Sequence, residues 1–124
     1  MLISEVSKTM DISADTLRYY EKIGLIPDVK RNKSGIRDYS EDDLMWIQFA
    51  KCMRSAGLSI EVLTEYLKLF KEGDSTLEVR KDILVEERSK LINKISDIQS
   101  TLERLDYKIS NYEEKIANKN KKVG

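Results

Sequence analysis

The segment Asp15-Thr16-Leu17-Arg18-Tyr19-Tyr20-Glu21-Lys22-Ile23-Gly24-Leu25-Ile26 decides how this chain folds. Ser13, just before it, has the short hydroxyl side chain that caps a helix N-terminus, and Asp15 adds a negative charge in the first turn. Gly24 suits the position after the last helical residue, where the backbone often adopts a positive φ. Together these residues predict a helix over 14–23.

A shorter helix is predicted before this one. Ile3, Val6 and Met10 recur at helical spacing and indicate a helix that ends near Asp11. Only residues 11–13 then separate the two helices, which is the arrangement of a helix-turn-helix unit. In DNA-binding proteins the second helix of such a unit enters the major groove.

The residues after Gly24 predict a small β-hairpin wing. Pro27 cannot continue the helix, because proline drives the preceding residue towards an extended conformation. Residues 30–32 and 36–39 then flank Lys33-Ser34-Gly35, a polar loop whose glycine can adopt a positive φ. Few apolar residues lie in the two strands, so we expect the wing to depend on neighbouring helices.

Two further helices complete the predicted head, which covers residues 1–73. Ser40 caps the third helix and Gly57 ends it, while Ser59 opens the fourth and Gly73 closes it. The sequence therefore predicts a mostly α chain with a winged helix-turn-helix head of four helices and a small β-hairpin wing.

A long last helix carries a heptad seam. Ser75 and Glu78 have the spacing of a capping box at its start. From residue 84 to 116, ten positions alternate steps of four and three residues, and all except Arg88 are apolar or tyrosine. This period is typical of a coiled coil. A seam of roughly 50 Å is too long for the head to cover, so we expect residues 75–116 to form a homodimer through Leu91, Ile95, Ile98, Leu102, Leu105, Ile109, Tyr112 and Ile116.

Composition narrows the possible functions. The chain has 124 residues, of which 35% are charged, with one cysteine and no histidine. A zinc or iron–sulfur site would lack ligands, and imidazole catalysis is impossible, so we expect no metal, no cofactor and no enzyme activity. No apolar run approaches the roughly 20 residues of a membrane span, and the N-terminus lacks the pattern of a secretory signal. We therefore expect a cytoplasmic protein without a membrane partner.

Basic residues gather in two places, although the net charge is zero. Between Arg18 and Arg37 there are six basic and two acidic residues, in the helix-turn-helix and the wing. Residues 115–124 contain four lysines and no acid, and we expect residues 117–124 to be a flexible tail.

These motifs together resemble the MerR family of bacterial transcription regulators. The resemblance rests on the segment quoted above, on Gly35-Ile36-Arg37-Asp38-Tyr39, on Asp43-Leu44 and on Met53-Arg54-Ser55-Ala56-Gly57-Leu58-Ser59. It covers residues 1–73, and the family uses the long helix that follows to dimerise. Asp11 departs from the glycine usual in the turn, and Ile36 from an aromatic residue frequent in the wing.

The resemblance implies which residues contact DNA. Thr16, Arg18, Tyr19 and Tyr20 would act from the recognition helix, with Tyr20 expected to be mainly a core residue. Arg31, Lys33, Arg37 and Tyr39 would contact phosphates from the wing, and Arg54 would contact the backbone. Arginine suits this role because it can donate two hydrogen bonds to a guanine or a phosphate.

The resemblance also implies a mechanism. A dimer would bind a pseudo-palindromic operator in an overlong promoter spacer and distort the double-stranded DNA so that RNA polymerase can use both promoter elements. The family's long helices pair antiparallel. Lys108 and Glu113 instead occupy heptad positions that would favour parallel chains, but such surface pairs contribute only about 0.2–1 kcal/mol, so we expect an antiparallel coiled coil.

Cys52 is the candidate effector-sensing residue. From the residues alone it is a small core residue of an apolar helix, with Lys51 and Arg54 able to stabilise a thiolate if they face it. The chain resembles the aldehyde- and thiol-stress-responsive branch of the family, in which a cysteine here reacts with electrophiles or oxidants. Two alternatives stay open: a regulator of the same kind that responds to a non-covalent ligand, and a coiled-coil adaptor that does not bind DNA.

Overall fold

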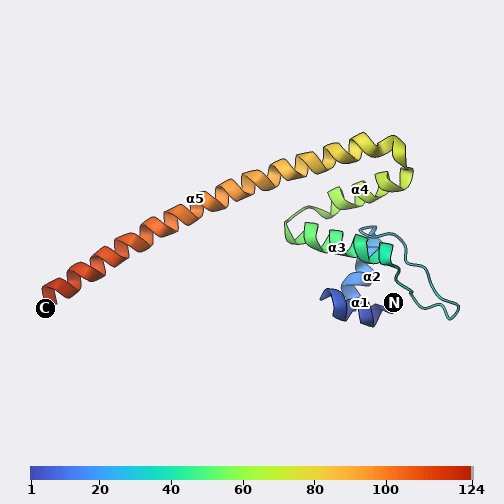
Figure 1. Ribbon diagram of the computed structural model, residues 1–124, viewed down its shortest axis with the longest axis horizontal. Coiled ribbons are helices and arrows are strands. Elements are labelled where there is room, and N and C mark those ends of the chain that lie inside the picture. Colours follow the sequence, from blue (N-terminus) through green and yellow to red (C-terminus); the bar gives the residue numbers. More distant parts are fainter. Residues whose placement is uncertain (124) are drawn as a thin grey trace. The chain divides into compact units, whose positions relative to one another are not determined.

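The computed structural model describes the backbone of residues 1–123 and the side chains of residues 1–121. Its described part is mostly helical (Figure 1), which confirms the predicted fold class. The elements are α1 (Ile3–Met10), α2 (Ala14–Ile23), α3 (Glu41–Ser55), α4 (Ile60–Glu72), the short 3-10 helix η1 (Asp74–Thr76) and α5 (Leu77–Val123).

Serine caps start three of these helices where the sequence predicted them. The hydroxyl oxygens of Ser13, Ser40 and Ser59 each accept a hydrogen bond of 3.1 Å from a backbone N–H in the first turn of α2, α3 and α4, respectively. Gly24 ends α2 with a φ of 83°. Asp11 ends α1 with a φ of 51°, the only positive φ outside glycine in the described backbone, and aspartate tolerates this conformation better than most residues.

One apolar core joins the first three helices. Val6 of α1, Leu17 of α2 and Ile47 of α3 have no exposed surface, and Ile26 and Val29 from the segment after α2 pack with them. Burial of each such side chain contributes about 1.5–3 kcal/mol. This core fixes α2 relative to α1, and thereby holds the helix-turn-helix together.

The predicted wing is reduced to a loop with a single antiparallel bridge, between Arg31 and Arg37. The side chain of Asn32 organises its tip by accepting hydrogen bonds from the N–H groups of Ser34 and Ile36, and Gly35 adopts a φ of 79°. The two predicted strands were wrong in extent, because so few of their residues are apolar that side-chain packing cannot extend the pairing.

The start of α5 is tied to α4. The Thr76 hydroxyl donates to the carbonyl oxygen of Leu69 at 2.7 Å, and the Arg80 guanidinium lies over the Phe70 ring at 5.2 Å. Ser75 lies inside η1, so the predicted cap at Ser75 was wrong. A tertiary hydrogen bond from Thr76 replaces the local capping box.

The chain divides into two compact units, Met1–Val85 and Glu86–Gly124. The first unit therefore includes the first turns of α5 as well as the predicted head. In the second unit α5 continues without interruption to Val123. Residues 117–123, for which the sequence predicted a flexible tail, belong to α5, and no glycine or proline interrupts residues 77–123. Gly124 lies outside the described residues.

Candidate nucleic-acid interface

Helix α2 presents two of its four predicted DNA contacts to solvent. Leu17 is fully buried and anchors the helix, whereas Arg18 and Tyr19 are exposed. The Arg18 guanidinium pairs with the Asp15 carboxylate at 2.9 Å, within one turn of the helix. Such a surface pair is weak, about 0.3–0.5 kcal/mol, so Arg18 can exchange it for a base or a phosphate.

The other two predicted contacts on α2 are partly buried. The Thr16 hydroxyl lies 2.7 Å from the Ser13 hydroxyl, so Thr16 takes part in the cap of the helix. Tyr20 packs against the core cluster, whereas Tyr19 is 49% exposed. Of the two neighbouring tyrosines, Tyr19 is therefore the one available to DNA.

The wing contributes Arg31 and Lys33 as exposed cations. One guanidinium nitrogen of Arg31 donates to the carbonyl oxygen of Gly35 at 2.9 Å, which closes the loop while the other nitrogens remain available. Lys33 lies at the tip of the loop. Both positive charges are therefore open to solvent on the wing.

Arg37 links the wing to α2 instead of facing solvent. Its Nε lies 2.8 Å from a carboxylate oxygen of Glu21, and both side chains are mostly buried, with exposed fractions of 22% and 14%. Partly buried ion pairs with this short geometry are stronger than surface pairs. The pair fixes the angle between the wing and the recognition helix, a positioning role that sequence reasoning did not assign.

Tyr39 is a core residue, and its assignment as a phosphate contact was wrong. The residue is 3% exposed, and its hydroxyl is buried without a hydrogen-bond partner among the described residues. Burial raises the pKa of Tyr39 above its ordinary value of 10.0, with the nearby positive charge of Arg37 acting in the opposite direction. In this position the hydroxyl does not face solvent.

Arg54 closes the turn between α3 and α4. Its guanidinium donates to the carbonyl oxygen of Leu58 at 2.8 Å, while the side chain remains exposed. A contact with the DNA backbone is compatible with this arrangement, because only one of its five N–H groups is used.

Cys52 is exposed on α3 and does not belong to the core of the head. The two basic neighbours that could have stabilised its thiolate are engaged elsewhere. Lys51 donates to the carbonyl oxygen of Met10 at 2.6 Å, and Arg54 donates to Leu58. The exposed thiol is accessible to small reagents in the single chain, but these two cations do not form an ion pair with it.

The heptad seam of the second unit is largely exposed. Ile95 and Ile98 are 66% and 67% exposed, and five more of the predicted interface residues, Leu102, Leu105, Ile109, Tyr112 and Ile116, are between 49% and 57% exposed. Only Leu91 is half-buried. A soluble chain rarely leaves so continuous an apolar stripe in contact with water.

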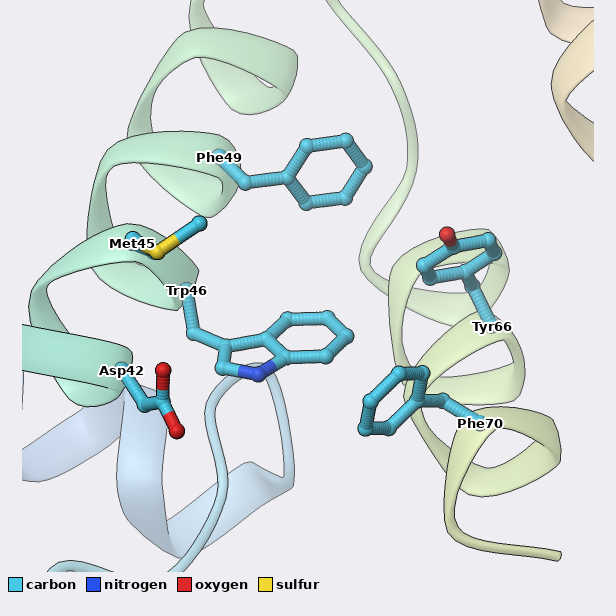
Figure 2. Close-up of a pocket in the computed structure, with 6 residues that line it drawn as sticks. All are labelled: Asp42, Met45, Trp46, Phe49, Tyr66 and Phe70. Atoms are coloured by element: carbon cyan, nitrogen blue, oxygen red, sulfur yellow. The ribbon is translucent and has the colours of Figure 1, made fainter. Parts of the chain in front are cut away.

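Sequence reasoning missed a hollow between α3 and α4 (Figure 2). It is about 380 Å³ in volume and is lined by Asp42, Met45, Trp46, Phe49, Tyr66 and Phe70. Aromatic residues at i, i+3 or i, i+4 on both helices were the available signal, because this spacing places them on one face. In residues 1–123 no group of three or more potential metal ligands lies together.

Comparison with known proteins identifies the family. Residues 1–69, more than half of the chain, match the MerR HTH family of regulatory proteins. The chain belongs to the MerR family. It is a DNA-binding transcription regulator and not an enzyme. The alternative of a coiled-coil adaptor without DNA binding is thereby excluded.

Individual relatives support this assignment. The chain is 62% identical to the transcriptional regulator AdhR of Bacillus subtilis over 92 residues, which are 74% of this chain and 66% of AdhR, just under two thirds of that protein. A crystal structure of a MerR family regulator from Listeria monocytogenes is 52% identical, with a TM-score of 0.89 over 91% of this chain and 86% of its own.

A third relative was solved with DNA. HiNmlR, a MerR family regulator lacking the sensor domain and bound to promoter DNA, is 31% identical, with a TM-score of 0.81 over 91% of this chain and 90% of its own. Within residues 1–123 of this chain, no helix is long and apolar enough to cross a membrane.

Proposed function

We propose that this MerR-family member acts as a homodimer on a pseudo-palindromic operator. The observation that carries the proposal is the exposed seam of α5, in which Ile95 and Ile98 keep about two thirds of their surface in the single chain. A second α5 would cover this stripe in an antiparallel coiled coil. Each copy would then present one α2 and one wing to successive half-sites.

Within each half-site, Arg18 and Tyr19 of α2 would enter the major groove. Arg31 and Lys33 of the wing would neutralise phosphates, while Arg37 would act through Glu21 to hold the wing in place. Thr16 and Arg54 would add contacts to the DNA backbone. HiNmlR, which has a similar fold and is bound to promoter DNA, supports this assignment of the DNA-facing surface.

The regulatory step would be a distortion of the promoter. Bending and untwisting an overlong spacer costs energy that depends on its sequence. A dimer that stabilises the distorted spacer would bring both promoter elements into reach of RNA polymerase and activate transcription. Footprinting of the chain on promoter DNA should show symmetric protection between the two promoter elements, and protection outside the spacer would contradict this mechanism.

DNA binding is tested by Arg18→Ala, with Arg104→Ala on α5 as a matched control. Loss of a base contact costs about 1–3 kcal/mol, or roughly 10- to 100-fold in operator affinity. The Arg104 variant should bind within about twofold of the unmodified protein. Electrophoretic mobility shift at several salt concentrations would also show a steep loss of affinity with salt, since phosphate contacts release counterions. Equal affinities for both variants would contradict the assignment of α2.

Modification of Cys52 is the trigger that we propose, and it makes the protein part of a response to electrophile stress. The thiolate of Cys52 would attack the carbonyl carbon of an aldehyde. A carbon–sulfur bond forms, the carbonyl π electrons move to oxygen, and the oxygen takes up the proton that the thiol lost. Exposure of Cys52 on α3 supports this step, because a packed core thiol would be protected.

The trigger is tested by following alkylation of Cys52 in the native dimer by intact mass. Cys52 is the single cysteine of the chain, so every adduct reports on this site. We expect reaction without denaturant and loss of aldehyde induction in Cys52→Ala, while operator affinity is unchanged. If the thiol reacts only after denaturation, or if Cys52→Ala is still induced, the effector would be a non-covalent ligand.

A further inference from the structure

The aromatic hollow between α3 and α4 has a composition that the proposed function does not use. Trp46 lies at its centre, with its indole 4.9 Å from the Phe70 ring and 6.2 Å from both the Phe49 and Tyr66 rings, centroid to centroid. Figure 2 shows Trp46 and Phe49 extending from α3 towards Tyr66 and Phe70 on α4. Four rings thus form the wall of one open hollow.

The rings are only partly covered. Phe70 is 46% exposed, and Trp46, Phe49 and Tyr66 are half-buried. The space beside them measures about 380 Å³, within the range of about 300–1,000 Å³ of small-molecule sites. The hollow is large enough for a small organic molecule.

A carboxylate lies at the edge of the rings. Figure 2 shows the Asp42 carboxylate beside the indole of Trp46, at the start of α3. Among the residues that the structure describes, no hydrogen bond or ion pair engages this side chain. Asp42 is therefore an unneutralised negative charge at the entrance of an aromatic hollow.

The adjoining surface is acidic as well. A neighbouring hollow of about 530 Å³ shares Asp42, Trp46 and Phe70 with the first and adds the carboxylates of Asp28, Asp38 and Asp43. Asp43 is used in the cap of α3, and Lys30 contributes one positive charge to the same surface. The Asp38 carboxylate is paired with the N-terminal ammonium at 2.9 Å. Four carboxylates against two positive charges leave the local charge negative.

We propose that this hollow binds an organic cation, such as a quaternary ammonium compound. The negative faces of aromatic rings attract cations, and a nearby carboxylate adds a full opposite charge. One cation–ring contact exists within the chain, where the Arg80 guanidinium, which also donates to the Thr76 hydroxyl, lies 5.2 Å from the centroid of the Phe70 ring. A neutral apolar ligand would leave Asp42 without a partner, so the charge selects the cation.

The proposal goes beyond DNA binding and the reaction of Cys52, because it assigns a separate non-covalent site to the head. Cys52 lies one helical turn after Phe49 on α3, but the proposed ligand does not need the thiol. Failure of the Cys52 trigger would therefore leave the cation site untouched, and the reverse also holds.

The test compares choline with its neutral isostere 3,3-dimethylbutan-1-ol on the full chain. Trp46 is the only tryptophan of the chain, so its fluorescence reports on the hollow directly. We expect a saturable change with choline at an affinity about tenfold or more above that of the alcohol. Equal affinities, or no binding of either compound, would overturn the proposal.

Two variants with the same change of charge locate the site. Asp42→Asn should weaken choline binding about threefold or more and leave the alcohol unaffected. Glu41→Gln, a neighbour in the same first turn of α3 that does not line the hollow, should change neither. An equal loss in both variants would mean general attraction to an acidic surface and would overturn the proposal. If Asp42→Asn alters the circular dichroism spectrum, Tyr66→Leu replaces it, with the same expected loss.

A second copy of the chain is the competing occupant of the hollow. Choline titrations at protein concentrations below and above the dimer dissociation constant distinguish the two. We expect the same affinity at both concentrations. An affinity that falls as the dimer forms would show that the partner chain fills the hollow, and would overturn the proposal.

Discussion

Apolar side chains of the two units have very different surroundings. In residues 1–85, Val6, Leu17 and Ile47 are completely buried, although they belong to three different helices. In residues 86–123, Ile95 and Ile98 are about two thirds exposed. The first unit completes a core within one chain, whereas the second leaves its apolar stripe exposed, and we propose that a second copy of the chain covers it.

Of the changes considered, a charged residue in the heptad seam should have the largest effect, and this effect is on the stability of the dimer. Ile98→Lys would place one lysine from each copy in an apolar interface, at a cost on the order of 3–5 kcal/mol, or a 100-fold or greater rise in the dimer dissociation constant. Sedimentation equilibrium measures it. Ser100→Lys, on the outer face of the same helix, is the control and should leave the dimer intact. A dimer unaffected by Ile98→Lys would mean that the seam is not the interface.

The second largest effect is expected when a buried side chain of the head is removed, which lowers the free energy of unfolding. Leu17→Ala removes a fully buried side chain of α2 and should lower the free energy of unfolding by about 2–5 kcal/mol. Urea denaturation followed by circular dichroism measures the change. Lys22→Ala, on the exposed face of the same helix, should stay within about 0.5 kcal/mol. Similar changes in the free energy of unfolding for both variants would contradict the conclusion that the first unit has a complete core of its own.

Replacing a serine by alanine should change the stability of the protein in opposite directions in the two units. Ser13→Ala removes the oxygen that caps α2 and should destabilise the protein by about 1 kcal/mol. Ser96→Ala lies inside α5, where alanine is the better helix former, and should be neutral or stabilising by up to about 0.5 kcal/mol. Thermal unfolding of the two variants provides the comparison, which two equal losses would contradict.

The smallest effect concerns a tyrosine hydroxyl. Tyr39→Phe removes a buried hydroxyl without a partner and should stabilise the head by about 1 kcal/mol at neutral pH. Because burial raises the pKa of Tyr39, the folded protein holds this proton more tightly than the unfolded chain. The resulting stability is present below pH 10 and is lost as the pH rises through the raised pKa; Tyr39→Phe should reduce that loss.

Urea unfolding between pH 7 and pH 11 measures the effect of Tyr39→Phe. Tyr107→Phe is the control from the second unit, because Tyr107 is 71% exposed, and it should change neither the stability nor its pH dependence. Operator affinity of Tyr39→Phe should stay within about twofold of the unmodified protein. A larger loss of DNA binding would restore Tyr39 to the phosphate contacts that the resemblance implied.

Local signals explain which parts of the fold were predictable. The caps at Ser13, Ser40 and Ser59 act on amides three residues away, so they can be identified in the sequence without knowledge of the tertiary fold. The predictions that were wrong depend on contacts between residues further apart in the sequence. Ser75 has the right spacing for a cap, but Thr76 reaches back seven residues to Leu69 and determines how α5 begins.

The residues of the candidate site also fall into those that the sequence placed correctly and those whose position depends on distant partners. Arg18 and Tyr19 were predicted as DNA contacts from the resemblance to the family, and both are exposed on α2. Arg37 and Tyr39 were assigned to DNA as residues of the wing, from the same resemblance. Arg37 instead pairs with Glu21, sixteen residues earlier, and Tyr39 enters the core. No short window of sequence contains these partners.

The sequence by itself determined the helices, their caps, the heptad seam and the membership in the MerR family, because each depends on residues within a few positions or on a motif of fixed spacing. Only the tertiary structure decided that Tyr39 is buried, that Arg37 holds the wing to α2, that Cys52 is exposed, and that Trp46 and Phe70 meet in one hollow. These features depend on contacts between segments far apart in the chain, and burial is a property of the packed molecule.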